Sequence, residues 1–200
     1  MKKIAVLLSG RGSNFISIKK AVDDGSINGE IVVVISNKAD AKGLAFAREN
    51  GLDGVFVDPK QFESREDYDR ELVRILKEKG TELVCLAGFM RIISPVFIEA
   101  FRNRILNIHP SLLPSFKGLD AQKQALEFGV RFAGCTVHFV DEEMDNGSII
   151  LQAVVPVEQT DTDDDLSARI LEQEHKIYPE AVRLFCADKL RTEGRRVFIN

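Results

Sequence analysis

Asn107 and His109 lie two residues apart, directly before Pro110 and after a short apolar stretch. On an extended strand the two side chains point to the same face, so an amide and an imidazole lie next to each other. Pro110 has no backbone N–H and cannot continue a central strand, so the strand is predicted to end here. Open α/β sheets bind ligands at the carboxyl ends of their strands, where two such donors could stabilise a developing oxyanion. The pair indicates acyl-transfer chemistry; the alternative is a loop with a capping Asn and a partly exposed His.

The acidic segment 141–145 contains the candidate partners of His109. A carboxylate close to the imidazole would favour its protonated form, which can act as an electrophile and a proton donor. Asp145 is one candidate, but Asp141, Glu142 and Glu143 are equally acidic. The residues alone do not choose among the four, and a solvated acidic loop without a catalytic role is the other interpretation.

Glu174 is an acid on the apolar stripe of a predicted helix. The stripe has helical spacing and consists of Leu166, Ile170, Glu174, Ile177 and Ala181. This spacing places a carboxylate on the inward face of the helix, where it is costly unless it is paired. Its partner is either a cation or amine of a substrate, or an internal base such as Arg169.

A glycine-containing turn, SGRGSN at 9–14, separates the first predicted strand from a helix. Glycines let the backbone approach a ligand, and the free N–H groups of a helix start favour an anion, so the turn has the outline of a phosphate site. A plain tight turn capped by Ser13 or Asn14 is the alternative. The dinucleotide fingerprint is absent, because Phe15 stands at its third glycine position and the second strand ends without an acid. No Gly-Lys-Ser/Thr follows, so neither NAD binding nor a P-loop is predicted.

The composition is that of a globular α/β protein. The chain has 200 residues, of which 44% are apolar, and this is enough to bury a sizeable core. The net charge of −4 and the pI of about 5.5 argue against a nucleic-acid-binding protein, although a local basic patch stays open. No apolar run approaches the ~20 residues of a membrane span. The first apolar run ends at Gly10, too early for a signal peptide, so a cytoplasmic protein is expected.

The three cysteines and the two other histidines form no recognisable metal or disulfide pattern. The three cysteines are scattered and make no CxxC pair, which predicts free thiols: Cys85, Cys135 and Cys186. His138 lies within an apolar strand and His175 on a helix flank, and both are interpreted as structural. Neither has metal-ligand spacing with His109, so no metal is expected.

Short apolar runs alternate with longer amphipathic ones along the chain. Strands are predicted at 4–9, 31–36, 55–57, 83–87, 105–108, 135–140 and 149–157. Helices are predicted at 15–24, 43–50, 64–79, 95–101, 121–128 and 163–185. This alternation indicates a single α/β domain, 1–200, with a mostly parallel twisted sheet of about seven strands and helices on both faces. The loop 141–148 is too short for a parallel crossover, so the last two strands are predicted to pair antiparallel.

Several motifs occur in order along the chain and carry a family resemblance. They are SGRGSN at 9–14, SNKAD at 36–40, LAGFMR at 86–91, NIHPSLLP at 107–114, TVHFV at 136–140 followed by Asp145 and Gly147, and QEHKIYP at 173–179. Each motif alone is weak evidence, but their joint occurrence is specific and covers essentially the whole chain. On these residues the sequence resembles the glycinamide ribonucleotide formyltransferases, which are folate-dependent transferases of purine biosynthesis.

The resemblance implies a fold and an activity. The fold would be the formyltransferase fold, with a Rossmann-like, phosphate-binding half at 1–100 and a catalytic, folate-binding half at 101–200. The activity would be transfer of the formyl group of 10-formyltetrahydrofolate to the amine of glycinamide ribonucleotide, without a metal. The partners would be these two small molecules rather than nucleic acid or a membrane, and the protein would be a monomer or a homodimer.

The resemblance also assigns roles to single residues. The catalytic residues would be Asn107 and protonated His109, which stabilise a tetrahedral oxyanion, and Asp145, which assists. The substrate would contact Gly12, Ser13, Asn14 and Glu174. The folate positions would be Arg65, Met90, Arg91, Ile92, Ile93, Asn107, Val140 and Asp141, with the 141–145 loop closing the pterin pocket. Some relatives carry histidine after Pro114, where this chain has Asp120 and Gln122, so no auxiliary histidine is expected there.

Three other functions compete with this one. Methionyl-tRNA formyltransferases and formyltetrahydrofolate hydrolases share similar motifs, but they carry a further tRNA-binding domain or an N-terminal regulatory domain, which this chain of 200 residues is not expected to contain. A non-catalytic sensor of nucleotide phosphate would use the glycine turn only. It would leave Asn107, His109 and Asp145 without a shared purpose.

Overall fold

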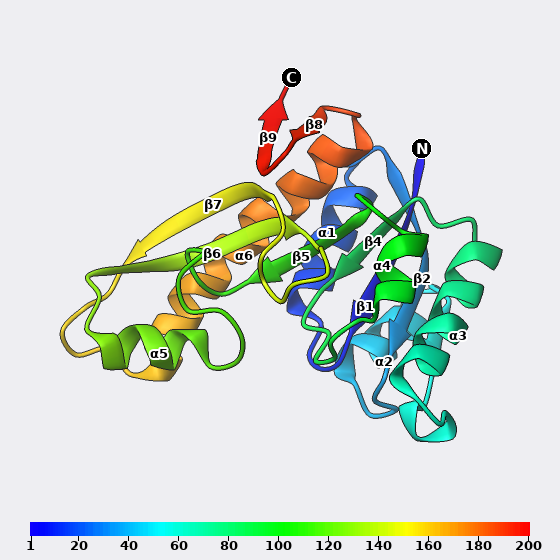
Figure 1. The fold of residues 1–200 in the computed structure, drawn as a ribbon, viewed down its shortest axis with the longest axis horizontal. Helices are drawn as coiled ribbons and strands as arrows, with labels where there is room; N and C mark the ends of the chain where they lie inside the picture. The colour runs from blue at the N-terminus through cyan, green and yellow to red at the C-terminus, as the bar shows by residue number, and fades with distance from the viewer.

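The computed structural model describes residues 1–200, and its central element is one mixed sheet of nine strands (Figure 1). The strands are β1 (Lys2–Leu8), β2 (Gly29–Ser36), β3 (Gly54–Phe56), β4 (Leu83–Leu86), β5 (Ile105–His109), β6 (Phe132–Phe139), β7 (Ile149–Pro156), β8 (Leu190–Glu193) and β9 (Arg196–Ile199). The helices are α1 (Ser13–Asp23), α2 (Lys42–Glu49), α3 (Arg65–Glu78), α4 (Pro95–Ala100), α5 (Ala121–Phe128) and α6 (Asp163–Cys186), with a short 3-10 helix at Pro59–Gln61. None of these helices combines the length and the apolar character that a membrane crossing requires.

The side chains of β1 alternate between two apolar cores, one on each face of the sheet. Ile4, Val6 and Leu8 belong to a core of 29 buried residues, whereas Ala5 and Leu7 belong to a core of 17. A period of two is what a strand buried on both faces requires. Helices α1, α2, α5 and α6 contribute to the larger core, and α3 and α4 to the smaller. The prediction of helices on both faces is confirmed.

The strand order reverses beside β1, and this reversal creates a ligand position. The order across the sheet is β3-β2-β1-β4-β5-β6-β7-β9-β8. The strands from β3 to β5 are parallel, while β6 pairs antiparallel with both β5 and β7, as predicted for the latter pair. After β3 the chain returns to the other side of β1, so β1 and β4 form a topological switch point, outside which open α/β sheets bind ligands. The glycine turn leaves the end of β1, and the loop that begins at Ala87 leaves the end of β4.

The sheet differs from the prediction at one end. All seven predicted strands and six predicted helices occur, with ends no more than three residues from those expected. The added strands β8 and β9 form a hairpin across Gly194-Arg195, and this hairpin joins the sheet through Ile149 and Arg196. Both strands are short and mostly exposed, so they lack the apolar alternation that identified the others. A glycine-led two-residue turn is the hairpin signal that could have revealed them.

Tyr178 connects α6 to the two strands that lead into the switch point. Its side chain is fully buried, and its hydroxyl donates to the carbonyl oxygens of Leu86 and Leu106, each at 3.0 Å. Leu86 is the last residue of β4, and Leu106 precedes Asn107 on β5. One helix side chain thereby contacts the end of β4 and the residue of β5 that precedes Asn107.

We expect Tyr178→Phe to lower the free energy of unfolding by about 1 kcal/mol, because two carbonyl oxygens lose a buried donor. Urea unfolding followed by circular dichroism measures this change. Tyr68→Phe is the matched control, since Tyr68 is equally buried and its hydroxyl has no partner. Equal destabilisation by the two substitutions would contradict a role for the Tyr178 hydrogen bonds.

Candidate active site

Strand β5 places Asn107 and His109 on one face at its carboxyl end. Asn107 is paired with Leu86 of β4 on one side and with His138 of β6 on the other. His109 is 5% exposed, and the chain leaves the sheet immediately after it, at Pro110. The predicted strand end and the predicted pair are therefore confirmed, and they lie where the parallel part of the sheet meets the antiparallel part.

The imidazole of His109 has a hydrogen-bond acceptor at each ring nitrogen. Nε2 lies 2.9 Å from the carbonyl oxygen of Phe116, which can only accept, so this nitrogen carries a hydrogen. Nδ1 lies 3.4 Å from Oδ2 of Asp145. A neutral ring with its hydrogen on Nε2 would turn a lone pair toward the carboxylate. Nε2 therefore makes the hydrogen bond of this ring, and Nδ1 faces the carboxylate at a longer distance.

The structure selects Asp145 from the four acids of its loop. The loop folds back so that Oδ2 of Asp145 also accepts the backbone N–H of Gly118, at 2.9 Å. The side chain of Asp145 is only 12% exposed, whereas Glu142 and Glu143 are exposed and Asp141 accepts the backbone N–H of Glu143. A solvated loop without specific contacts is thus the wrong interpretation. The partner of His109 is Asp145.

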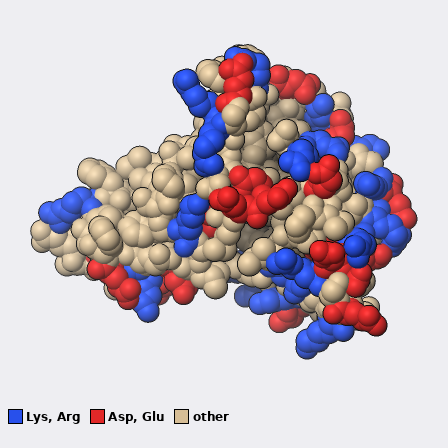
Figure 2. Space-filling model, in the orientation of Figure 1, with Lys and Arg blue, Asp and Glu red and all other residues tan.

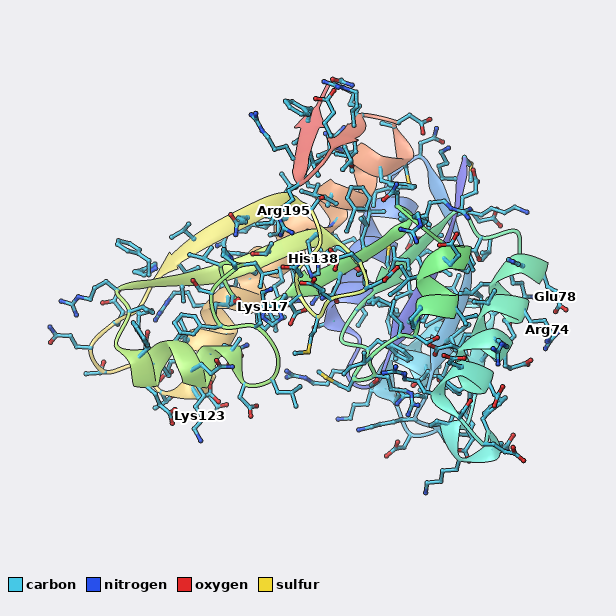
Figure 3. The ribbon with its side chains drawn as sticks, in the orientation of Figure 1. Arg74, Glu78, Lys117, Lys123, His138 and Arg195 are labelled. Carbon is cyan, nitrogen blue, oxygen red and sulfur yellow. The ribbon has the colours of Figure 1, made fainter.

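Two basic side chains hold the residue that follows Asp145. Nζ of Lys117 donates to Oδ1 of Asn146 at 2.9 Å, and Nη2 of Arg195 donates to its backbone oxygen at 2.7 Å. Figure 3 shows Lys117 and Arg195 on either side of His138, near the middle of the molecule. Arg195 belongs to the turn of the β8–β9 hairpin. The unexpected hairpin therefore reaches the loop that carries Asp145.

His138 is structural, as interpreted from the sequence, but it also contacts the site. Nδ1 donates to the carbonyl oxygen of Phe139 at 2.8 Å, so Nε2 accepts from the side-chain amide of Asn107 at 3.1 Å. Burial lowers the pKa of His138, which keeps the ring neutral and able to accept. This contact orients the Asn107 amide and leaves its second hydrogen for a ligand. Asn107 and His138 lie opposite each other because β5 pairs antiparallel with β6, a pairing that was not predicted.

The glycine turn leaves the N-terminus of α1 uncapped. Gly12 is the N-cap residue with φ of 76°, and no side chain caps the helix. The alternative of a turn capped by Ser13 or Asn14 is therefore wrong. A Cβ at Gly12 would lie 2.8 Å from the Cα of Gly43, so only glycine allows α1 and α2 to approach this closely. The first N–H groups of α1 are left without partners in the helix, an arrangement that favours an anion.

Glu174 of α6 reaches this turn. It is 7% exposed, and its Oε2 accepts from Nδ2 of Asn14 at 2.7 Å. Arg169 is not its partner, because it forms a bidentate pair with Asp161 at 2.6 and 2.8 Å. Burial raises the pKa of Glu174, since no cation compensates its charge. With the buried Oδ1 of Asn14 also unpartnered, the pair offers acceptors to a donor group of a ligand.

The predicted folate positions include an exposed apolar pair in the loop that leaves the switch point. In the loop between β4 and α4, Met90 and Ile92 are 66% and 62% exposed, although Ile93 next to them is buried. Arg65 begins α3 and is exposed. Val140 and Asp141 follow β6 and are half-buried. The exposed apolar pair suits a flat, weakly polar ring, and Arg65 offers a positive charge to an anionic group.

Charges of both signs surround this region. On the face shown in Figure 2, lysine and arginine side chains are interspersed with aspartate and glutamate, and acidic side chains gather in the middle. A continuous basic surface for a nucleic-acid backbone is not present on this face.

Comparison with known proteins gives matches along the chain. The sequence profile described as Formyl transferase matches residues 2–182. The phosphoribosylglycinamide formyltransferase of Escherichia coli (strain K12) is 47% identical over 197 residues, which cover 98% of this chain and 93% of that protein. The trifunctional purine biosynthetic protein adenosine-3 of Gallus gallus is 50% identical over 182 residues, or 91% of this chain and 18% of that protein. The chain thus spans less than a fifth of the length of such trifunctional relatives.

Solved structures are also similar to this chain along almost its whole length. The structure of glycinamide ribonucleotide transformylase 1 from Symbiobacterium toebii has a TM-score of 0.98 at 54% identity, over 100% of this chain and 94% of that chain. A phosphoribosylglycinamide formyltransferase from Anaplasma phagocytophilum has a TM-score of 0.92 at 43% identity, over 99% of this chain and 93% of that chain. The similarity therefore includes the sheet and both helical layers.

We expect Glu174→Gln to stabilise the fold at neutral pH. Burial raises the pKa of Glu174 in the folded protein. The protonated carboxyl therefore contributes to the free energy of unfolding, and this contribution is complete below pH 4.5 and is lost as the pH rises through the raised pKa. Glutamine avoids this loss and can still accept from Asn14. Thermal unfolding should show a higher Tm than wild type at pH 7.5 and no difference near pH 4. Glu180→Gln on the same helix is the control and should not raise the Tm, because Arg183 lowers the pKa of Glu180. A lower Tm of Glu174→Gln at pH 7.5 would contradict the argument.

Proposed function

Because this chain belongs to the phosphoribosylglycinamide formyltransferases within the formyl transferase family, we propose that it transfers the formyl group of 10-formyltetrahydrofolate to the amine of glycinamide ribonucleotide in de novo purine biosynthesis. The observation that carries the proposal is the position of His109, which lies beside Asn107 at the end of β5 and between the Phe116 carbonyl and the Asp145 carboxylate. A charged donor and an amide donor at one strand end are what an acyl-transfer oxyanion requires.

In the proposed mechanism, Asn107 and protonated His109 donate hydrogen bonds to the oxyanion that forms when the substrate amine adds to the formyl carbon. Nε2 of His109 stays bonded to the Phe116 carbonyl, so the donor to the oxyanion is Nδ1, which lies 3.4 Å from Asp145 and makes no hydrogen bond to it. The amide hydrogen of Asn107 that does not contact His138 is available for this purpose. Asp145 keeps His109 protonated and assists in removing the proton that the amine loses on addition. A proton must also reach the folate nitrogen as the carbon–nitrogen bond breaks, and His109 is the nearest charged donor that these contacts provide.

The remaining site residues position the two substrates. In the proposal, the free N–H groups of Gly12, Ser13 and Asn14 hold the phosphate, and Glu174 accepts hydrogen bonds from the other end of the ribonucleotide. Fixing a remote phosphate orients the amine toward the formyl group and lowers the barrier through proximity. This division assigns phosphate binding to the half 1–100 and catalysis to the half 101–200.

The folate would lie against the loop after β4. Met90, Ile92 and Ile93 supply apolar contacts for the pterin ring, with Val140 and Asp141 on the other side of the pocket. Arg65 and Arg91 supply positive charge for the carboxylates of the folate tail. The exposure of Met90 and Ile92 supports this assignment, because two large apolar side chains in one short loop offer an apolar surface that a flat ring can cover.

The deciding experiment is consumption of the formyl donor with and without the amine substrate. We expect tetrahydrofolate to appear, measured by absorbance, only when glycinamide ribonucleotide is present. Equal rates without the ribonucleotide would indicate a hydrolase instead. Binding of the ribonucleotide without any loss of formyl donor would indicate a sensor of nucleotide phosphate.

The role of Asp145 is tested by the pH dependence of kcat. Asp145→Asn keeps the shape but removes the charge that stabilises the imidazolium, so the limb of the profile that needs protonated His109 should move to lower pH. The rate at pH 7.5 should fall by on the order of tenfold or more. Glu142→Gln and Glu143→Gln are controls whose charges are exposed and screened, and they should leave the profile unchanged. An equal shift in all three variants would reject the pairing.

A further inference from the structure

The segment Gly88–Ser94, called here the folate loop, is fixed at its first end by Ser9. The backbone N–H of Ser9 donates to the carbonyl oxygen of Gly88 at 3.0 Å. The hydroxyl of Ser9 accepts the backbone N–H of Met90 at 2.8 Å and donates to Oδ1 of Asn37 at 2.6 Å. The end of β1 thereby holds the start of this loop beside the glycine turn.

A buried carboxylate from another helix fixes the far end of the folate loop. Asp69 of α3 is 1% exposed, and its Oδ2 accepts the backbone N–H of Ser94 at 2.5 Å. Ser94 precedes α4, and its own side chain does not cap that helix. The carboxylate of Asp69 thus holds the backbone of the residue that precedes α4, so the position of the loop depends on α3.

The middle of the folate loop is held by the neighbouring residue of α3. The guanidinium of Arg91 lies 4.6 Å from the centroid of the Tyr68 ring, a cation–π arrangement. Tyr68 is completely buried, and its hydroxyl has no hydrogen-bond partner. Nε of Arg91 is also buried and unpartnered. Buried unpartnered polar atoms are uncommon in native proteins, so two at one contact indicate an arrangement kept for a purpose other than stability.

The electrostatics of Asp69 connect it to the two arginines assigned to the folate. Burial raises the pKa of Asp69, while hydrogen bonds from Ser94 and the charges of Arg91 and Arg65 oppose this shift. No other acidic side chain perturbs Asp69. A buried carboxylate without a full ion pair costs stability, and aliphatic packing would not.

We propose that Asp69, supported by Tyr68, is a positioning residue that fixes the folate loop as one wall of the folate site. The proposal rests on the function proposed above. With the loop anchored by Ser9, Arg91 and Ser94, Met90 and Ile92 cannot turn inward to bury their own side chains. Their exposure is thereby preserved for the ring of the folate.

The test compares the KM values of the two substrates in variants of Asp69. Asp69→Ala removes the acceptor of the Ser94 N–H, and we expect the KM for 10-formyltetrahydrofolate to rise about tenfold, or ~1.4 kcal/mol. The KM for glycinamide ribonucleotide should stay within twofold, because the glycine turn does not depend on Asp69. Asp69→Asn should recover most of the folate affinity, since the amide oxygen can accept the same N–H. The control is Glu78→Gln, because Glu78 pairs with Arg74 and points outward from α3 (Figure 3).

A second variant and a direct binding measurement keep the test independent of catalysis. Tyr68→Leu removes the ring from Arg91 and should raise the folate KM at least threefold, with the ribonucleotide KM unchanged. Titration of tetrahydrofolate, followed by fluorescence, should give the same ranking of variants even if the wild-type protein transferred no formyl group. The proposal is overturned if Asp69→Ala keeps folate affinity within twofold of wild type, if the affinities for both substrates fall together, or if Asp69→Asn is no better than Asp69→Ala.

Discussion

The site depends on one constraint, which is that both nitrogens of the His109 ring face an acceptor. The Phe116 carbonyl fixes one nitrogen and the Asp145 carboxylate the other. Both supporting residues have positive φ angles, 52° at Phe116 and 48° at Asp145, which are costly for residues other than glycine. The contacts of Lys117, Gly118 and Arg195 hold the two segments in these conformations. Two of the five non-glycine residues with positive φ thus lie in the segments that face the His109 ring.

Two buried carboxylates contact the other loops of the site. Glu174 and Asp69 are both buried without a full ion pair, and burial raises the pKa of each. An apolar residue at either position would pack at lower cost. Both carboxylates instead lie beside a loop that is assigned to a substrate, the glycine turn for Glu174 and the folate loop for Asp69. The two buried carboxylates thus lower the stability of the fold at the two loops that they contact, the glycine turn and the folate loop.

Local patterns predicted the elements and part of the site. The alternation in β1 and the sequence Asn107, His109, Pro110 depend on neighbours in the chain, so the two strands and the position of Asn107 and His109 at a strand end could be predicted. The residue types did not choose Asp145 from the four acids, because that choice depends on how the loop folds back toward Gly118, and only the family resemblance pointed to Asp145. The contact of His138 with Asn107 requires the β5–β6 register, and the role of Asp69 requires the packing of α3 on α4. The exposed hairpin β8–β9 lacked the apolar spacing on which strand prediction depends.

The hydrogen bond between Asn14 and Glu174 joins residues that are 160 positions apart. During synthesis on a ribosome, the first strands and the glycine turn emerge long before α6 exists. Until that helix docks on α1, the amide of Asn14 has no carboxylate beside it, and the phosphate end of the site is incomplete. A partly folded chain therefore cannot hold the ribonucleotide in the proposed way. The proposed site is complete only when α6, the longest helix, docks on the larger core.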